Sequence, residues 1–202
     1  MNSTRIRFMT QLSLLFAVQI ILCVTPLGYI PLGPIDITIM HIPVLVGAIV
    51  LGQSAGLILG TTFGITSILV ATFRPTLGSF LFTPFYTGGN FYSIIIAMVP
   101  RISFGLLTAC LFIWLDRTKI SRPICAGIAA AAGSLCNTVL VMGGIYLFFG
   151  KEYADLLGVP FSGILAVIAS VIVTNGIPEI LAAVLLCTAL VVPLRGKKQP
   201  KA

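Results

Sequence analysis

The sequence predicts an all-α membrane protein, a bundle of six transmembrane helices that forms one domain over residues 1–202. Two observations lead to this fold class. First, 58% of the residues are hydrophobic and only 8% are charged, whereas a soluble domain carries about a quarter charged residues. Second, long apolar runs follow one another along the whole chain with no polar insert. A chain of this kind needs lipid as its solvent.

The apolar runs set the expected helices, since a bilayer core takes about 20 apolar residues per helix. The expected helices cover residues 8–25, 37–52, 54–73, 92–115, 124–149 and 163–193. The second run is short, and only residues 52–54 separate it from the third. We therefore expect the second helix to span incompletely, or with the help of tilt.

Proline, glycine and charge mark three loops, at residues 26–36, 74–91 and 150–162. If the N-terminus lies inside, nine of the twelve Lys and Arg residues also lie inside, two lie outside and one falls within a helix. The inner set is Arg5, Arg7, Arg117, Lys119, Arg122, Arg195, Lys197, Lys198 and Lys201. This bias predicts that both ends are cytoplasmic and that the three loops face outside. Basic residues at the ends of apolar runs also argue against nucleic-acid binding.

Two ionisable residues, Arg101 and Glu179, fall at middle depth in expected helices, where a charge is costly and points to function. Asn137 lies halfway along the fifth helix, and Asn175 shares a helical face with Glu179. One interpretation is that the four side chains converge on a polar ligand. The alternative is that Arg101 pairs with Glu179 and only fastens helices together. A proline precedes each charged residue and frees a backbone carbonyl one turn back, as expected beside a cavity.

Three further residues are candidates for substrate binding. His41, near the start of the second helix, has either a structural role or a ligand contact. Tyr86 and Asn90 belong to the aromatic, glycine-containing loop 74–91. That loop either anchors the chain at the membrane interface or covers an outward-facing pocket.

The sequence contains little from which to build a catalytic or metal centre. It has one His and five acidic residues, and its five cysteines form no CxxC pair. The patterns GxxxxGK[ST] and HExxH do not occur. We therefore expect no catalytic residues, no metal and no cofactor, and any use of ATP must come from other subunits.

Five segments carry a resemblance to a known family. They are Ile42–Ala48, Leu51–Gly60, Val99–Ile102, Gly133–Thr138 and Asn175–Glu179, in this order. Together they resemble the substrate-binding S component of an energy-coupling factor (ECF) vitamin transporter, over about residues 8–193. The resemblance implies a six-helix fold without ATPase activity, in the plasma membrane of a prokaryote. It also implies a membrane coupling protein and two cytoplasmic ATPases as partners.

The resemblance also suggests a docking position and a substrate. In the family, small residues of the first helix with the spacing AxxxA meet the coupling protein. Ser13 and Ala17 have a comparable spacing here, although Ser replaces the first Ala. The pantothenate branch is the most similar, and a mid-membrane Arg suits a carboxylate while Asn amides suit hydroxyl and amide groups. Riboflavin, folate and lipoate stay open as substrates.

Two other functional classes stay open as well. A secondary transporter working alone would use Glu179 as a proton relay, but six helices without an internal repeat make that less natural. A membrane enzyme would need acid–base groups that this chain scarcely offers. Co-purification with ATPases would favour the transporter subunit, and uptake by the chain alone in proton-loaded vesicles would favour the secondary transporter.

Overall fold

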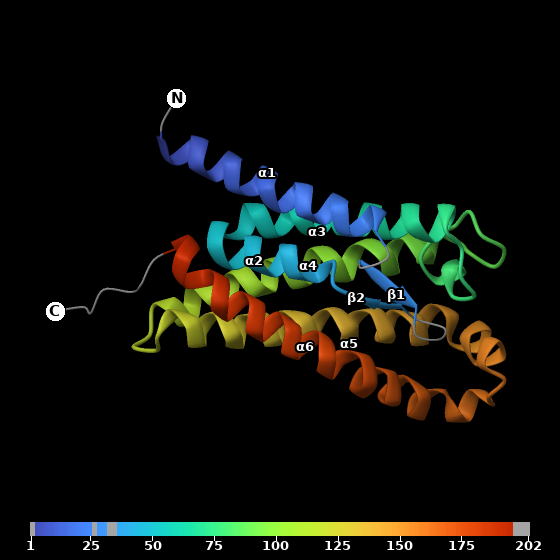
Figure 1. The fold of residues 1–202 in the computed structure, drawn as a ribbon. Coiled ribbons are helices and arrows are strands. Elements are labelled where there is room, and N and C mark those ends of the chain that lie inside the picture. The colour runs from blue at the N-terminus through green and yellow to red at the C-terminus, as the bar shows by residue number, and fades with distance from the viewer. Residues whose placement is uncertain (1–2, 26–27, 32–35, 196–202) are drawn as a thin grey trace.

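The protein is a bundle of helices in the computed structural model, which describes residues 3–25, 28–31 and 36–195 (Figure 1). In chain order the elements are α1 (Ser3–Val24), β1 (Tyr29–Pro31), β2 (Asp36–Thr38), α2 (His41–Leu51), α3 (Gln53–Phe73), the 3-10 helix η1 (Ser79–Leu81), α4 (Phe91–Asp116), α5 (Arg122–Leu157), the 3-10 helix η2 (Phe161–Gly163) and α6 (Ile164–Arg195). Within the described residues, five helices are long and apolar enough to cross a membrane, and α2 is a shorter apolar helix. The helical fold class and a multi-pass membrane protein are thus confirmed.

Helix α2 begins later than the sequence predicts. Residues 36–38 are not helical but form β2, which pairs antiparallel with β1 and places Ile37 opposite Ile30. The 11 residues of α2 extend about 16 Å at 1.5 Å per residue, roughly half of a hydrocarbon core about 30 Å thick. Residues 41–49 are buried, and α2 contacts all five other helices. Its N-terminal end therefore lies inside protein, where lipid does not reach the open backbone groups.

Helix α5 ends later than predicted, so the expected loop 150–162 is wrong in its first half. The backbone bends at Phe149 (φ −135°, ψ 21°), but the helix continues to Leu157. Tyr153 in this extension is buried against the apolar cluster that contains Phe149, whereas Lys151 and Glu152 are exposed. The charges that suggested a loop thus occupy the outer side of an amphipathic turn.

Helices α3 and α4 pack closely through glycines spaced four residues apart. A Cβ atom added at Gly60 would lie 2.5 Å from the backbone oxygen of Arg101, and one added at Gly56 would lie 2.6 Å from that of Gly105. Small residues at this spacing let two helix backbones approach each other. The contact holds the α4 backbone at Arg101 directly against α3.

The ends of the elements gather at two opposite ends of the bundle (Figure 1). Helix α1 begins and α6 ends at one of them, which also carries the connection from α4 to α5. The opposite end carries the β1–β2 ribbon, the segment 74–90 and the connection from α5 to α6. Helix α1 lies at the edge of the bundle, against α2 and α3.

Candidate functional site

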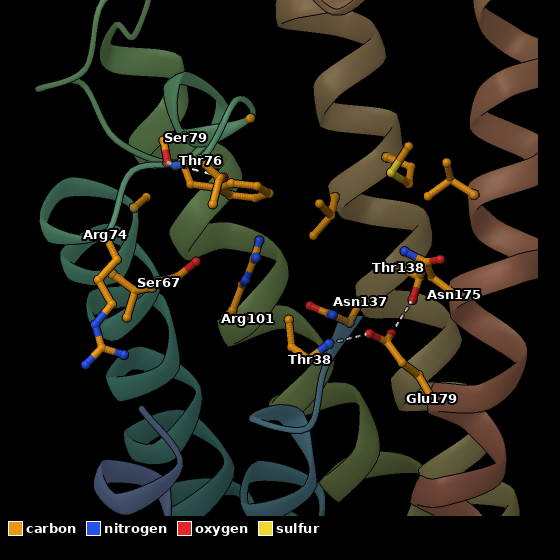
Figure 2. Close-up of a pocket in the computed structure, with 17 residues that line it drawn as sticks. Thr38, Ser67, Arg74, Thr76, Ser79, Arg101, Asn137, Thr138, Asn175 and Glu179 are labelled. Atoms are coloured by element: carbon orange, nitrogen blue, oxygen red, sulfur yellow. Dashed lines mark hydrogen bonds between the residues drawn. The ribbon is translucent and has the colours of Figure 1, made fainter. Parts of the chain in front are cut away.

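A cavity lies at the end of the bundle that carries the ribbon and η1. Thr38 of β2, the segment after α3, and helices α3, α4, α5 and α6 all contribute to its wall. It holds about 790 Å³ of empty space when its open mouth is included. Arg101, Asn137, Asn175 and Glu179 all line it. The structure thus brings together the four polar residues that the sequence singles out at middle depth (Figure 2).

Arg101 rises from α4 into the cavity (Figure 2), and only 4% of its surface is exposed. It lies ten residues beyond Phe91, the first residue of α4, and therefore about 15 Å along the helix. Its Nη1 donates a hydrogen bond of 2.6 Å to the backbone oxygen of Ile96. In a regular helix the backbone N–H of residue 100 would donate to this oxygen, but Pro100 has no backbone N–H.

Two aromatic rings flank the Arg101 guanidinium. Its Cζ lies 5.4 Å from the ring centroid of Phe63, on α3, and 5.1 Å from that of Phe82, which follows η1. A guanidinium this close to an aromatic face is attracted by the ring quadrupole. The rings and the Ile96 carbonyl together hold the cation in one place.

Glu179 forms the opposite wall of the cavity, on α6. Its carboxylate accepts hydrogen bonds from the backbone N–H of Thr38 at 3.0 Å and from Oγ1 of Thr138 at 3.3 Å (Figure 2). These bonds tie α6 to the ribbon and to α5. Two threonines thus supply these hydrogen bonds, and the alternative of an Arg101–Glu179 fastening stays a prediction.

Two asparagines line the same cavity, Asn137 on α5 and Asn175 on α6. Asn137 is 7% exposed, and its Oδ1 is buried without a hydrogen-bond partner among the described residues. Figure 2 shows its amide directed from α5 toward Arg101. Asn175 stands on α6, and its Oδ1 accepts a hydrogen bond of 3.2 Å from Thr174. Because a buried polar atom without a partner is costly, the Asn137 amide is ready for a ligand.

The other predicted site residues do not line this cavity. His41 is buried beneath the ribbon, where its Nδ1 lies 2.8 Å from the backbone oxygen of Thr38. Asn90 caps α4, and its Oδ1 accepts a hydrogen bond of 2.8 Å from the N–H of Tyr92. Tyr86 is 37% exposed. Contact of these three residues with a substrate stays a prediction.

Sequence reasoning missed several wall residues. Phe82 lies in the aromatic segment 74–91 and Thr138 follows Asn137, but nothing in the sequence sets either residue apart from its neighbours. Thr38 contributes a backbone N–H, which no pattern of side chains reveals. Arg74 lines the rim, but its Nη2 donates to the backbone oxygen of Val24 at 3.0 Å, and Figure 2 shows its guanidinium directed away from Arg101.

The cavity has two chemically different sides. The α3–α4 side presents a guanidinium fixed between aromatic rings, which suits a carboxylate. The α5–α6 side presents amides, a hydroxyl and a carboxylate, which suit hydroxyl and amide groups of a ligand. Such a site matches a small, polar organic anion.

Comparison with known proteins agrees with this chemistry. The family described as "ECF transporter, substrate-specific component" matches residues 7–191. The chain is 36% identical over 164 residues to a pantothenic acid transporter from Lactococcus lactis subsp. cremoris, which covers 78% of this chain and 77% of that protein. It is 26% identical over 198 residues to a pantothenate transporter from Leuconostoc mesenteroides, covering 94% and 93%. This chain, with its helical bundle and buried polar cavity, belongs to the family of substrate-specific components of ECF transporters.

Proposed function

We propose that this transporter component binds pantothenate. The observation that carries the proposal is the buried Arg101 at the cavity wall, held opposite Asn137, Asn175 and Glu179. Both relatives described above are named as transporters of this compound. Pantothenate carries a carboxylate at one end, an amide in the middle and two hydroxyl groups at the other end, and the cavity offers a partner for each.

In this proposal the substrate binds in one defined orientation in the cavity. Its carboxylate accepts hydrogen bonds from Arg101, because a guanidinium binds a carboxylate through two parallel N–H donors. Its amide and hydroxyl groups face Asn137, Asn175 and Glu179. This direction keeps the substrate carboxylate away from the Glu179 carboxylate, since like charges repel in a cavity of low dielectric constant.

We also propose how the chain lies in the membrane. Six crossings, with α2 completing its crossing through the ribbon, put both termini in the cytoplasm of a prokaryotic cell and the cavity mouth outside. The positive-inside bias supports this orientation. Of the nine residues in the inner set, Lys197, Lys198 and Lys201 lie outside the described residues. Arg74 and Lys151 stand at the opposite end, in the segments beside η1 and beyond the bend of α5.

The partners in this proposal are a membrane coupling protein and two cytoplasmic ATPases, since the chain itself has no ATP-binding loop. Ser13 and Ala17 are both exposed on α1, one turn apart. Small exposed side chains at this spacing allow a second helix to approach closely. We assign the docking of the coupling protein to this face.

Mass spectrometry of small molecules retained by the purified protein tests the substrate. Pantothenate is the expected mass, and added pantothenate should displace any retained ligand while riboflavin, folate and lipoate should not. Retention of one of these other vitamins would overturn the substrate assignment. Uptake by the chain alone into proton-loaded vesicles would instead support a secondary transporter.

A further inference from the structure

Pro100 lies within α4, one residue before Arg101. We propose that Pro100 is a positioning residue, which orients Arg101 toward the substrate by leaving the carbonyl of Ile96 available to the guanidinium. This inference rests on the proposed binding of pantothenate. It concerns how the site gains its preference for an anion.

The helical hydrogen-bond pattern explains the contact. In an α-helix the N–H of each residue bonds the carbonyl four residues earlier, so the N–H of residue 100 would bond Ile96. Proline has no N–H, and the Ile96 oxygen loses that partner. Ile96 is 1% exposed, and a buried carbonyl without a partner is costly. Nη1 of Arg101 supplies the missing donor at 2.6 Å.

The direction of the side chain follows from this bond. Ile96 lies five residues before Arg101, so the guanidinium turns toward the start of α4. Side chains on a helix already lean toward its N-terminus. Phe63 and Phe82 then flank the cation from α3 and from the segment after η1. The Ile96 carbonyl is the only one of these contacts that depends on residue 100.

An N–H at position 100 would compete for the same carbonyl. It would draw the Ile96 oxygen back toward the helix axis and straighten α4 at this turn. The guanidinium would then lose its fixed direction. A ligand that binds through the guanidinium should then bind more weakly, whereas the affinity of a ligand that does not should change little.

The experiment compares two ligands that differ only at the acid. Pantothenyl alcohol has a hydroxymethyl group in place of the pantothenate carboxylate, so the ratio of the two Kd values reports the contribution of the anion. For Pro100→Ala we expect pantothenate binding to weaken about tenfold, equivalent to 1.4 kcal/mol. The Kd for the alcohol should change less than about twofold, because the alcohol has no carboxylate to form charge-assisted hydrogen bonds with the guanidinium.

Matched variants separate this effect from a general change in the helix. Pro193 also lies within a helix, is exposed and does not line the cavity, so Pro193→Ala should alter neither Kd. Pro100→Val also restores the N–H with a side chain of similar volume, and it should behave like Pro100→Ala. In an Arg101→Gln background, Pro100→Ala should no longer change the ratio of the two Kd values.

Several outcomes would overturn the inference. Equal weakening of both ligands in the two Pro100 variants would mean that Pro100 only shapes α4, and unchanged Kd values for both ligands would mean that Arg101 does not need the Ile96 carbonyl. If the wild-type protein does not bind pantothenate at all, the proposed function itself fails. If the wild type prefers the acid, Arg101→Gln loses that preference and both Pro100 variants keep it, only this inference fails.

Discussion

Arg101 carries the most direct chemistry of the molecule, because it is a charge with 4% exposure in a chain with few charges. Specific contacts offset the cost of burying this cation: a backbone carbonyl at 2.6 Å and two aromatic faces. Burying an ion without such contacts would cost several kcal/mol. A site that maintains this ion is expected to use it.

Replacing Arg101 should therefore weaken substrate binding strongly. Loss of a charge-assisted hydrogen bond costs about 1.5–3 kcal/mol, so Arg101→Ala should raise the Kd for pantothenate at least about tenfold. Arg101→Lys should restore binding only in part, since an ammonium group cannot form two parallel hydrogen bonds to a carboxylate. Isothermal titration calorimetry measures both. Arg117→Ala, an exposed residue in the connection between α4 and α5, is the control and should leave the Kd unchanged.

The sequence identifies much of the site at this scale, but not its hydrogen bonds. Arg101, Asn137, Asn175 and Glu179 stand out because polar residues within apolar runs are expensive. Their neighbours do not stand out, because threonines are common in membrane helices and the Thr38 contact uses the backbone. The pairing of Arg101 with Glu179 was plausible from charge alone. Only the three-dimensional arrangement brings Thr38 and Thr138 to the Glu179 carboxylate.

Among the elements, α3 and α4 make the contact that fixes the site. Gly60 faces the backbone of Arg101, and an added Cβ would lie 2.5 Å from that residue's oxygen. Backbone atoms cannot move aside as a flexible side chain can. The two helices would have to separate at the position of the guanidinium.

Gly60→Ala should thus lower stability as well as affinity. We expect the free energy of unfolding to fall by about 1–3 kcal/mol, as in other overpacked interiors. The matched control is Gly143→Ala on α5, where an added Cβ meets nothing within 4 Å and helix propensity improves by up to about 1 kcal/mol. Thermal unfolding in detergent compares the two variants. Equal stability of Gly60→Ala and the wild type would contradict the close packing described here.

Helix α1 should contact the coupling protein rather than the substrate. Its inner face is held by Gln19, which donates to the backbone oxygen of Leu59 at 3.1 Å, while Ser13 and Ala17 are exposed. Ala17→Trp should abolish uptake by the assembled transporter, since an indole blocks the approach of a second helix. Pantothenate binding by the isolated chain should stay within about twofold of wild type, because α1 does not line the cavity.

The control for this docking prediction uses the same substitution on another side of α1. Val18 is 40% exposed and lies about 100° around the helix from Ala17. Val18→Trp should keep its uptake, since a large apolar side chain facing lipid is tolerated. Loss of ligand binding in Ala17→Trp would assign that position to the internal fold.

The element boundaries show where sequence reasoning fails. Residues 37 and 38 begin the second helix that the sequence predicts, yet residues 36–38 pair with residues 29–31. Such a ribbon depends on pairing between two separate segments of the chain, and the hydrophobicity of one segment alone does not predict that pairing. Beyond Phe149, the burial of Tyr153 outweighs the loop signal of three nearby charges. Apolar length alone predicted the other helices well, because the bilayer imposes it.

Over the whole molecule, the two ends of the bundle differ in charge and in function. The cavity lies at the end with the ribbon and η1, while most of the basic residues that the structure describes belong to the start of α1, the end of α6 and the connection from α4 to α5, at the opposite end (Figure 1). If both termini are cytoplasmic, the cavity faces the outside, where a substrate for uptake is found.

Accessibility to a membrane-impermeant thiol reagent tests this orientation in intact cells. In a variant without the five native cysteines, Asp155→Cys should react from outside and Lys119→Cys only after the membrane is opened. Both positions are exposed, at opposite ends of the bundle. The positive-inside bias is the physical reason for this expectation. The reverse labelling pattern would mean that the protein has the opposite orientation in the membrane.

The most direct test of the central claim is equilibrium binding of pantothenate to the purified chain without any partner subunit. We expect one substrate per chain, no competition by excess riboflavin, folate or lipoate, and binding weakened at least about tenfold in Arg101→Ala. Absence of pantothenate binding by the folded wild-type chain, or unchanged affinity in Arg101→Ala, would contradict the assignment of this cavity as the pantothenate site.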